Sequence, residues 1–202
     1  TLGHWTNFTF EWYERLFSTP EITDALVVTI SVAVISALMA TVLGTAAAIG
    51  LHAMRRRPRA LIENISQLPM VNPDLVTGIS LMLLFLFIGL KDGYTRLVIA
   101  HITFNLPYVI FSVLPKLRQS SNMLYEAALD LGATPRQALH KVILPEIMPG
   151  IVTGGIMAFT MSVDDFVVSY FTAGTTSQPL SVVIYSMTRH RMTPKINAVS
   201  TL

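Results

Sequence analysis

The chain has 202 residues, of which 52% are hydrophobic and only 13% are charged, and its formal net charge is +2. A soluble domain carries about 25% charged residues, so this composition and a mean hydropathy of +0.57 indicate an integral membrane protein. The chain contains no cysteine, which excludes disulfides, thiolate catalysis and cysteine-based metal sites. Its basic residues form no stripe with interleaved aromatics, so the sequence does not predict nucleic-acid binding.

The first predicted span covers residues 25–54, which contain no Asp, Glu, Lys or Arg. An aromatic and acidic segment, 1–24, precedes it, and we expect that segment to lie at the outer membrane interface. At about 1.5 Å per residue the span is long enough to cross a hydrocarbon core of about 30 Å. Gly44 and the alanines that follow it give a small-residue face for close helix packing. A basic run, 55–59, follows directly and predicts that this end of the span is cytoplasmic.

Three further spans are predicted at 68–90, 97–115 and 147–173, and an external re-entrant or interfacial segment follows at 175–195. The third span contains His101 and Asn105, which lie one helical turn apart on one face. We expect these two side chains to form hydrogen bonds with neighbouring helices rather than to contact a substrate.

Polar residues at irregular points of the predicted spans are candidates for a substrate pathway. Asn72 and Asp74 lie among prolines that predict a kinked or unwound start of the second span. Asp164 and Asp165 interrupt the fourth span, and Tyr170 adds an aromatic rim. Carboxylates are costly inside a membrane, and irregular backbone is tolerated there where it lines a cavity. We therefore predict a pathway lined by these residues; the alternative is that the acids pair internally or lie at the membrane interface.

A polar segment at about 120–146 joins the third and fourth spans and predicts a helix, a tight turn and a second helix. Gly132 supplies the left-handed residue that ends the first helix. Thr134 is the predicted N-cap of the second helix, and Gln137 completes a capping box. One narrow apolar stripe is expected on the first helix, formed by Leu124, Ala127, Ala128 and Leu131.

Two features of this first helix indicate a partner. Glu126 and Asp130 are like charges one turn apart and repel each other unless a cation lies nearby. Ala127 and Ala128 make a flat face that fits closely into a groove on another protein. The alternative is an ordinary cytoplasmic helix-turn-helix linker.

The segment resembles the signature of permease subunits of bacterial ABC importers, written E-A-A-x3-G-x9-I-x-L-P. Val142 replaces the isoleucine, and the positions that match are Glu126, Ala127, Ala128, Gly132, Leu144 and Pro145. The resemblance implies that this loop, with Asp130 in it, is the coupling helix that inserts into an ATP-binding subunit. It also implies an all-α, polytopic transmembrane helical bundle with the type I ABC importer permease fold, in one domain spanning 1–202. Members of this family usually carry one more span at each end, so we expect the sequence to be truncated at both ends.

The segments 72–76, 101–107 and 161–169 look like those of permease subunits of spermidine/putrescine importers. This resemblance implies polyamine transport across the bacterial cytoplasmic (inner) membrane, in contact with membrane lipid. The implied partners are a homologous sister permease, two ATP-binding subunits and an extracytoplasmic substrate-binding protein. ATP and magnesium would be bound by the ATP-binding subunit, so the chain itself is expected to hold no cofactor and no metal.

Motifs for catalysis are missing from the sequence. It contains no nucleotide-binding loop, no G-x-S-x-G elbow and no H-E-x-x-H pair, so catalysis is expected to come from a partner. Two alternatives stay open at this point. One is an ABC permease of the same type for an amino acid, a sugar or a ferric complex. The other is an ion-driven secondary transporter that uses Asp164 or Asp165 for protons, although such a carrier has no ATPase to dock.

Overall fold

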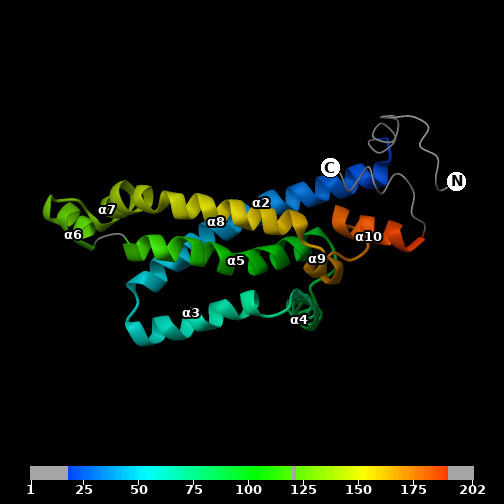
Figure 1. The fold of residues 1–202 in the computed structure, drawn as a ribbon, viewed down its shortest axis with the longest axis horizontal. Coiled ribbons are helices and arrows are strands. Elements are labelled where there is room, and N and C mark those ends of the chain that lie inside the picture. Colours follow the sequence, from blue (N-terminus) through cyan, green and yellow to red (C-terminus); the bar gives the residue numbers. More distant parts are fainter. Residues whose placement is uncertain (1–17, 120–121, 191–202) are drawn as a thin grey trace, which may run out of the picture.

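The computed structural model describes residues 18–119 and 122–190, and every regular element within these ranges is helical (Figure 1). Three stretches among them are long and apolar enough to cross a membrane: α2 (Pro20–Ala53), α5 (Tyr94–Gln119) and Pro135–Asp164, which ends with α8 (Leu144–Asp164). The remaining elements are α3 (Arg56–Val71), α4 (Asp74–Phe87), α6 (Asn122–Asp130), α7 (Pro135–Ala138), the π-helical turn η1 (Leu139–Ile143), α9 (Val167–Thr172) and α10 (Leu180–His190). The predicted all-α membrane architecture is confirmed. Of the aromatic segment at 1–24, residues 1–17 lie outside the described ranges.

α2, α5 and α8 lie side by side along the long axis of the molecule and form its core (Figure 1). Small residues set their spacing, because a Cβ added at Gly44 of α2 would lie 2.7 Å from the side chain of Val109 on α5. A Cβ at Gly150 of α8 would lie 2.9 Å from the carbonyl oxygen of Ser112. Close approach of this kind replaces the hydrophobic effect as the packing force between helices in lipid. The small-residue face predicted around Gly44 is therefore a packing face.

The second predicted span is sharply bent. α3 begins already at Arg56 and ends at Val71, and the axes of α3 and α4 differ by 107°. Pro73 explains the break, because proline cannot donate a backbone hydrogen bond and disfavours the helical conformation of the residue before it. Asn72 accordingly has extended dihedral angles, with φ −72° and ψ 144°. The pair α3 and α4 makes up a fourth crossing if it is counted as one broken span.

A second break separates α8 from α9, as expected from the two adjacent aspartates. α4 packs against α9 at this end of the bundle. A Cβ added at Gly78 of α4 would lie 3.1 Å from the ring of Phe171 and 3.4 Å from the carbonyl oxygen of Val167. α10 then packs on the start of α2, where the backbone amide of Leu180 donates to the Thr29 hydroxyl at 2.8 Å.

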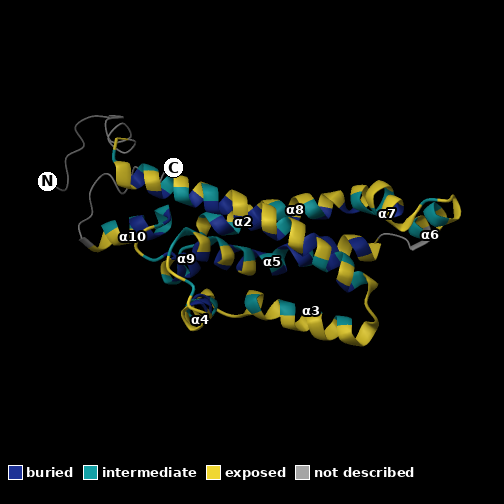
Figure 2. Ribbon diagram, turned by 180° about the vertical axis from the view of Figure 1, so that it is seen from behind, coloured by how far each residue is buried: buried dark blue, intermediate teal, exposed yellow. Residues whose placement is uncertain are grey.

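Exposed positions run along the long helices of the bundle (Figure 2), and many of them are large apolar residues. Val42 on α2 is 68% exposed and Ile156 on α8 is 62% exposed. A soluble helix bundle would carry charged residues on this surface. The surface therefore fits lipid or another membrane subunit.

Candidate coupling and substrate-pathway sites

The first candidate site is the turn between α6 and α7. Gly132 ends α6 with a φ of 85°, in the left-handed region that glycine adopts at least cost. The amide of Ala133 donates to the carbonyl of Ala128 at 3.0 Å, which is the closing bond of a Schellman motif. Thr134 and Gln137 then form the predicted capping box, with bonds of 2.9 and 3.4 Å. The helix end predicted at Gly132 and the capping box predicted for Thr134 and Gln137 are both confirmed.

Most of the apolar stripe predicted on α6 is exposed, with Ala128 half-buried. Leu124 is 46% exposed and Leu131 is 89% exposed, at one extreme end of the molecule (Figure 1). Glu126, Ala127 and Asp130 are exposed as well, and neither acid pairs with a cation within the described ranges. An apolar stripe flanked by unpaired acids is suited to contact a partner.

The π-helical turn η1 joins this site to α8. The amide of Leu144 donates to the carbonyl of Leu139, five residues earlier. Pro145 has no N–H, so the carbonyl of Lys141 loses the partner that it would have in a regular helix. A wider turn accommodates this loss. Leu144 and Pro145, the last two signature positions, therefore shape the connection between the loop and the membrane helix.

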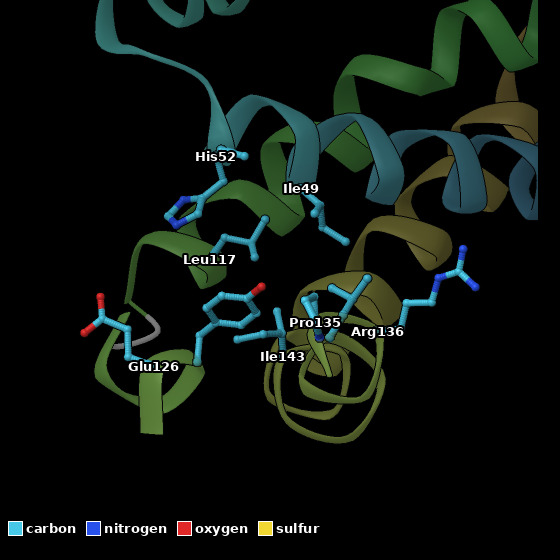
Figure 3. Close-up of a pocket in the computed structure, with 10 residues that line it drawn as sticks. Ile49, His52, Leu117, Glu126, Pro135, Arg136 and Ile143 are labelled. Carbon is cyan, nitrogen blue, oxygen red and sulfur yellow. The ribbon is translucent and has the colours of Figure 1, made fainter. Parts of the chain in front are cut away.

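A cavity of about 500 Å³ lies between the loop and the ends of α2 and α5 (Figure 3). Most of its lining is apolar, including Ile49, Leu117 and Ile143. Glu126 and Arg136 lie on opposite sides of it (Figure 3). α6 packs mainly on α7 and η1, and η1 packs on α8.

A charged cluster fixes α3 to α5 close to this loop. Oε1 of Glu63 accepts hydrogen bonds of 2.7 Å from both Arg59 and Arg118. The bond from Arg59, and then that from Arg118, holds the pKa of Glu63 below its ordinary value of 4.5, although partial burial opposes this shift. The carboxylate is therefore charged at neutral pH. No local sequence pattern indicates this cluster, because 55 residues separate Glu63 from Arg118.

The second candidate site lies at the two helix breaks. Asp74 is the first residue of α4, and Asp164 is the last residue of α8. Both residues are exposed, as are Asn72 and Tyr170. Neither acid forms an ion pair with a cation in the described part of the chain. Because α4 packs on α9 through Gly78, the two breaks lie in the same region of the molecule.

Asp165 has a different environment from its neighbour, since its side chain is only 6% exposed. Its carboxylate accepts hydrogen bonds from the amides of Val168 at 3.2 Å and Ser169 at 2.7 Å. It thereby caps the first turn of α9. Its own carbonyl accepts a bond of 2.8 Å from the hydroxyl of Ser181 on α10.

His101 lies at the centre of a buried polar network. Nδ1 lies 2.6 Å from the hydroxyl of Ser162 on α8, and Nε2 lies 3.0 Å from that of Ser169 on α9. The Ser162 hydroxyl is also 3.1 Å from that of Ser36 on α2. The predicted interhelical hydrogen bonding is confirmed for His101. For Asn105 it is not, because its amide atoms are buried with no partner among the described residues.

Aromatic rings extend this second candidate site towards α10. The ring of Tyr170 lies 5.6 Å from that of Phe166 and 5.9 Å from that of Tyr185. The guanidinium of Arg189 lies 6.0 Å from the Tyr185 ring centre, at the outer limit of a cation–π contact. Only Tyr170 of this cluster was predicted, since the contribution of α10 depends on the tertiary fold.

Comparison with known proteins identifies the family. Residues 40–201 match the family described as "Binding-protein-dependent transport system inner membrane component". The chain is 37% identical to the "Spermidine/putrescine transport system permease protein PotC" of Escherichia coli (strain K12), over 98% of this chain and 75% of that protein. It is 36% identical to the PotC protein of Haemophilus influenzae, over 98% and 77%. It is 34% identical to the "Putrescine transport system permease protein PotI" of Escherichia coli (strain K12), over 98% and 73%.

A solved structure described as an amino acid ABC transporter with histidines has the same fold. The match has a TM-score of 0.68 and covers 96% of this chain and 91% of that chain, at 18% sequence identity. Within the described ranges, no group of three or more His, Cys, Asp or Glu is placed to hold a metal. The chain belongs to the binding-protein-dependent transport system inner membrane component family, as a non-catalytic inner-membrane permease subunit of an ABC importer that acts with ATPase and binding-protein subunits.

Proposed function

We propose that this permease subunit moves polyamines of the spermidine and putrescine class inward across the membrane. The relatives named for spermidine/putrescine and putrescine transport support this substrate class. A polyamine is a flexible chain with several ammonium groups. Several carboxylates along the pathway therefore favour its passage.

The observation that carries the proposal is the pair of exposed acids at the helix breaks, Asp74 and Asp164, neither joined to a cation in the described part of the chain. A partly dehydrated carboxylate attracts an ammonium group more strongly than one in bulk water does. Two acids at separate positions pass a polycation from one to the next. Conduction requires binding that is favourable but weak enough for release.

Asn72, Tyr170 and Asp165 complete the proposed pathway in different roles. The Asn72 amide offers an acceptor beside Asp74, and the exposed face of Tyr170 offers a cation–π contact of about 0.5–2 kcal/mol. Asp165 adds negative charge while it caps α9. The sister permease would cover the other side of this pathway.

In the same proposal, α6 receives the motion of the ATP-binding subunit. Glu126, Ala127, Ala128 and Asp130 form the face that docks, and Gly132 ends the helix that carries them. Leu144 and Pro145 connect this face with α8. Closure of the ATP-binding subunits would then change which side of the membrane the pathway faces.

The rival within this family is a permease for a different solute, such as an amino acid or a sugar. A neutral solute gives no reason for two unpaired acids at the helix breaks, whereas a polycation does. The other rival, an ion-driven carrier, does not fit a binding-protein-dependent family.

The test is uptake by the complete complex in proteoliposomes, with Asp164→Asn and Asp74→Asn. Each change removes charge and keeps shape, so spermidine uptake should fall on the order of tenfold, as expected from losing about 1.4 kcal/mol of attraction. Asp24→Asn is the matched control, because Asp24 is an exposed acid near the start of α2. Co-purification of the subunits reports assembly. If both pathway variants transport spermidine at the original rate, the assignment is wrong.

A further inference from the structure

The α8–α9 break is bridged by a side chain from a third helix. His101 of α5 is 1% exposed, and its two ring nitrogens contact Ser162 before the break and Ser169 after it. Ser162 also contacts Ser36, so the bridge connects α2, α5, α8 and α9. One side chain therefore contacts both sides of the break.

The chemistry of the ring suits this bridge. A neutral imidazole has one nitrogen that donates and one that accepts. A serine hydroxyl does either, so both hydrogen bonds form whichever tautomer is present. Asp165 lies 3.7 Å from Nε2 and caps α9 on the same side. The ring is thus fixed by groups from both halves of the broken helix.

α9 needs such support because it has only six residues. A helix this short is unstable alone and takes its position from tertiary contacts. Its contacts include the Asp165 cap, the bond to His101, the packing of Gly78 from α4, and a hydrogen bond of 3.3 Å from Nη2 of Arg96 on α5 to the carbonyl oxygen of Phe171. Of the two bonds from the central helix α5, the one from His101 also joins α9 to α8, through Ser162.

We propose that His101 is a positioning residue that clamps the α8–α9 break and so fixes the orientation of Asp164 in the substrate pathway. The importance of Asp164 rests on the proposed function, but the clamp itself does not. His101 makes no contact with substrate in this account. It acts through Ser162 and Ser169.

The experiment uses a thiol reporter, Asp164→Cys, in the assembled complex. The chain has no cysteine of its own, so the labelling rate by an impermeant thiol reagent is read on this subunit alone. His101→Asn keeps the position of Nδ1 and loses the bond to Ser169, whereas His101→Gln keeps the position of Nε2 and loses the bond to Ser162. Each should raise the labelling rate about fivefold, the factor expected from one lost hydrogen bond.

Ser169→Ala tests the same bond from the other side and should give the same rise as His101→Asn. The double variant with His101→Asn should be labelled no faster than His101→Asn alone, because that change has already removed the bond to Ser169. The double variant with His101→Gln should be labelled faster than His101→Gln alone, because that change keeps the bond. Thr172→Val is the matched control, since among the described residues the buried Thr172 hydroxyl bonds within its own helix, to the carbonyl of Val168. It should leave the labelling rate unchanged.

Labelling at the original rate in Ser169→Ala would overturn the clamp, and this variant decides the question if the His101 variants do not assemble. Equal rises in Ser169→Ala and Thr172→Val would also overturn it, because they would indicate general loosening of α9. If labelling responds as expected while Asp164→Asn still transports polyamine at the original rate, the clamp stands and the proposed pathway fails.

Discussion

Asp164 and Asp165 are neighbours in the sequence but have opposite environments. Asp164 ends α8 and is exposed, whereas Asp165 is buried and caps α9. The direction of each side chain follows from the helix break, which turns the chain between the two residues. Of these two acids, only Asp164 is therefore accessible to a substrate.

We expect Asp165→Asn to weaken the assembled complex. An asparagine side chain has one acceptor oxygen for the amides of Val168 and Ser169, so one buried donor loses its partner at a cost of about 1–3 kcal/mol. The melting temperature of the purified complex should fall. Asp164→Asn should leave it unchanged, because that side chain caps no helix. Equal melting temperatures for Asp165→Asn and the original protein would show that the cap is not needed.

Substitutions in the turn between α6 and α7 test whether this loop docks on the ATP-binding subunit. Gly132 and Gly89 have φ of 85° and 71°, and neither has an atom within 4 Å of an added Cβ. Alanine therefore introduces similar backbone strain at both positions, about 1–2 kcal/mol. Only Gly132 lies in the proposed docking loop. Gly132→Ala should reduce co-purification of the ATP-binding subunit and uncouple uptake from ATP hydrolysis, whereas Gly89→Ala should not. Equal effects of the two changes would contradict the docking role.

The elements also show which features were predictable. The Schellman turn at Gly132 and the capping box of Thr134 depend on residues three to five positions apart, so the sequence contained the whole signal. The break at Pro73 was predicted, but its angle of 107° was not, because the packing of α4 on α9 sets it. The contacts of Ser36 with Ser162 and of Glu63 with Arg118 join distant segments. A pattern of neighbouring residues in the sequence cannot predict contacts between such distant segments.

At the scale of the whole molecule, the basic run at 55–59 and the α6–α7 turn lie at the same end of the bundle (Figure 1). Positive charge predicts that this end is cytoplasmic. A cysteine at position 57 should be protected from an impermeant thiol reagent in intact cells, and one at Gly93 should be labelled. The reverse pattern would place the docking loop on the side of the membrane that has no ATP-binding subunit.

The central claim is that this permease conducts a polycation under the control of ATP. The most direct measurement is the initial rate of uptake by proteoliposomes that contain the complete complex, with spermidine, putrescine, a neutral amino acid and a sugar compared at equal concentration. Uptake of spermidine or putrescine should require ATP, and an excess of the neutral solutes should not reduce it. Uptake of a neutral solute alone, or polyamine uptake that does not depend on ATP, would contradict it.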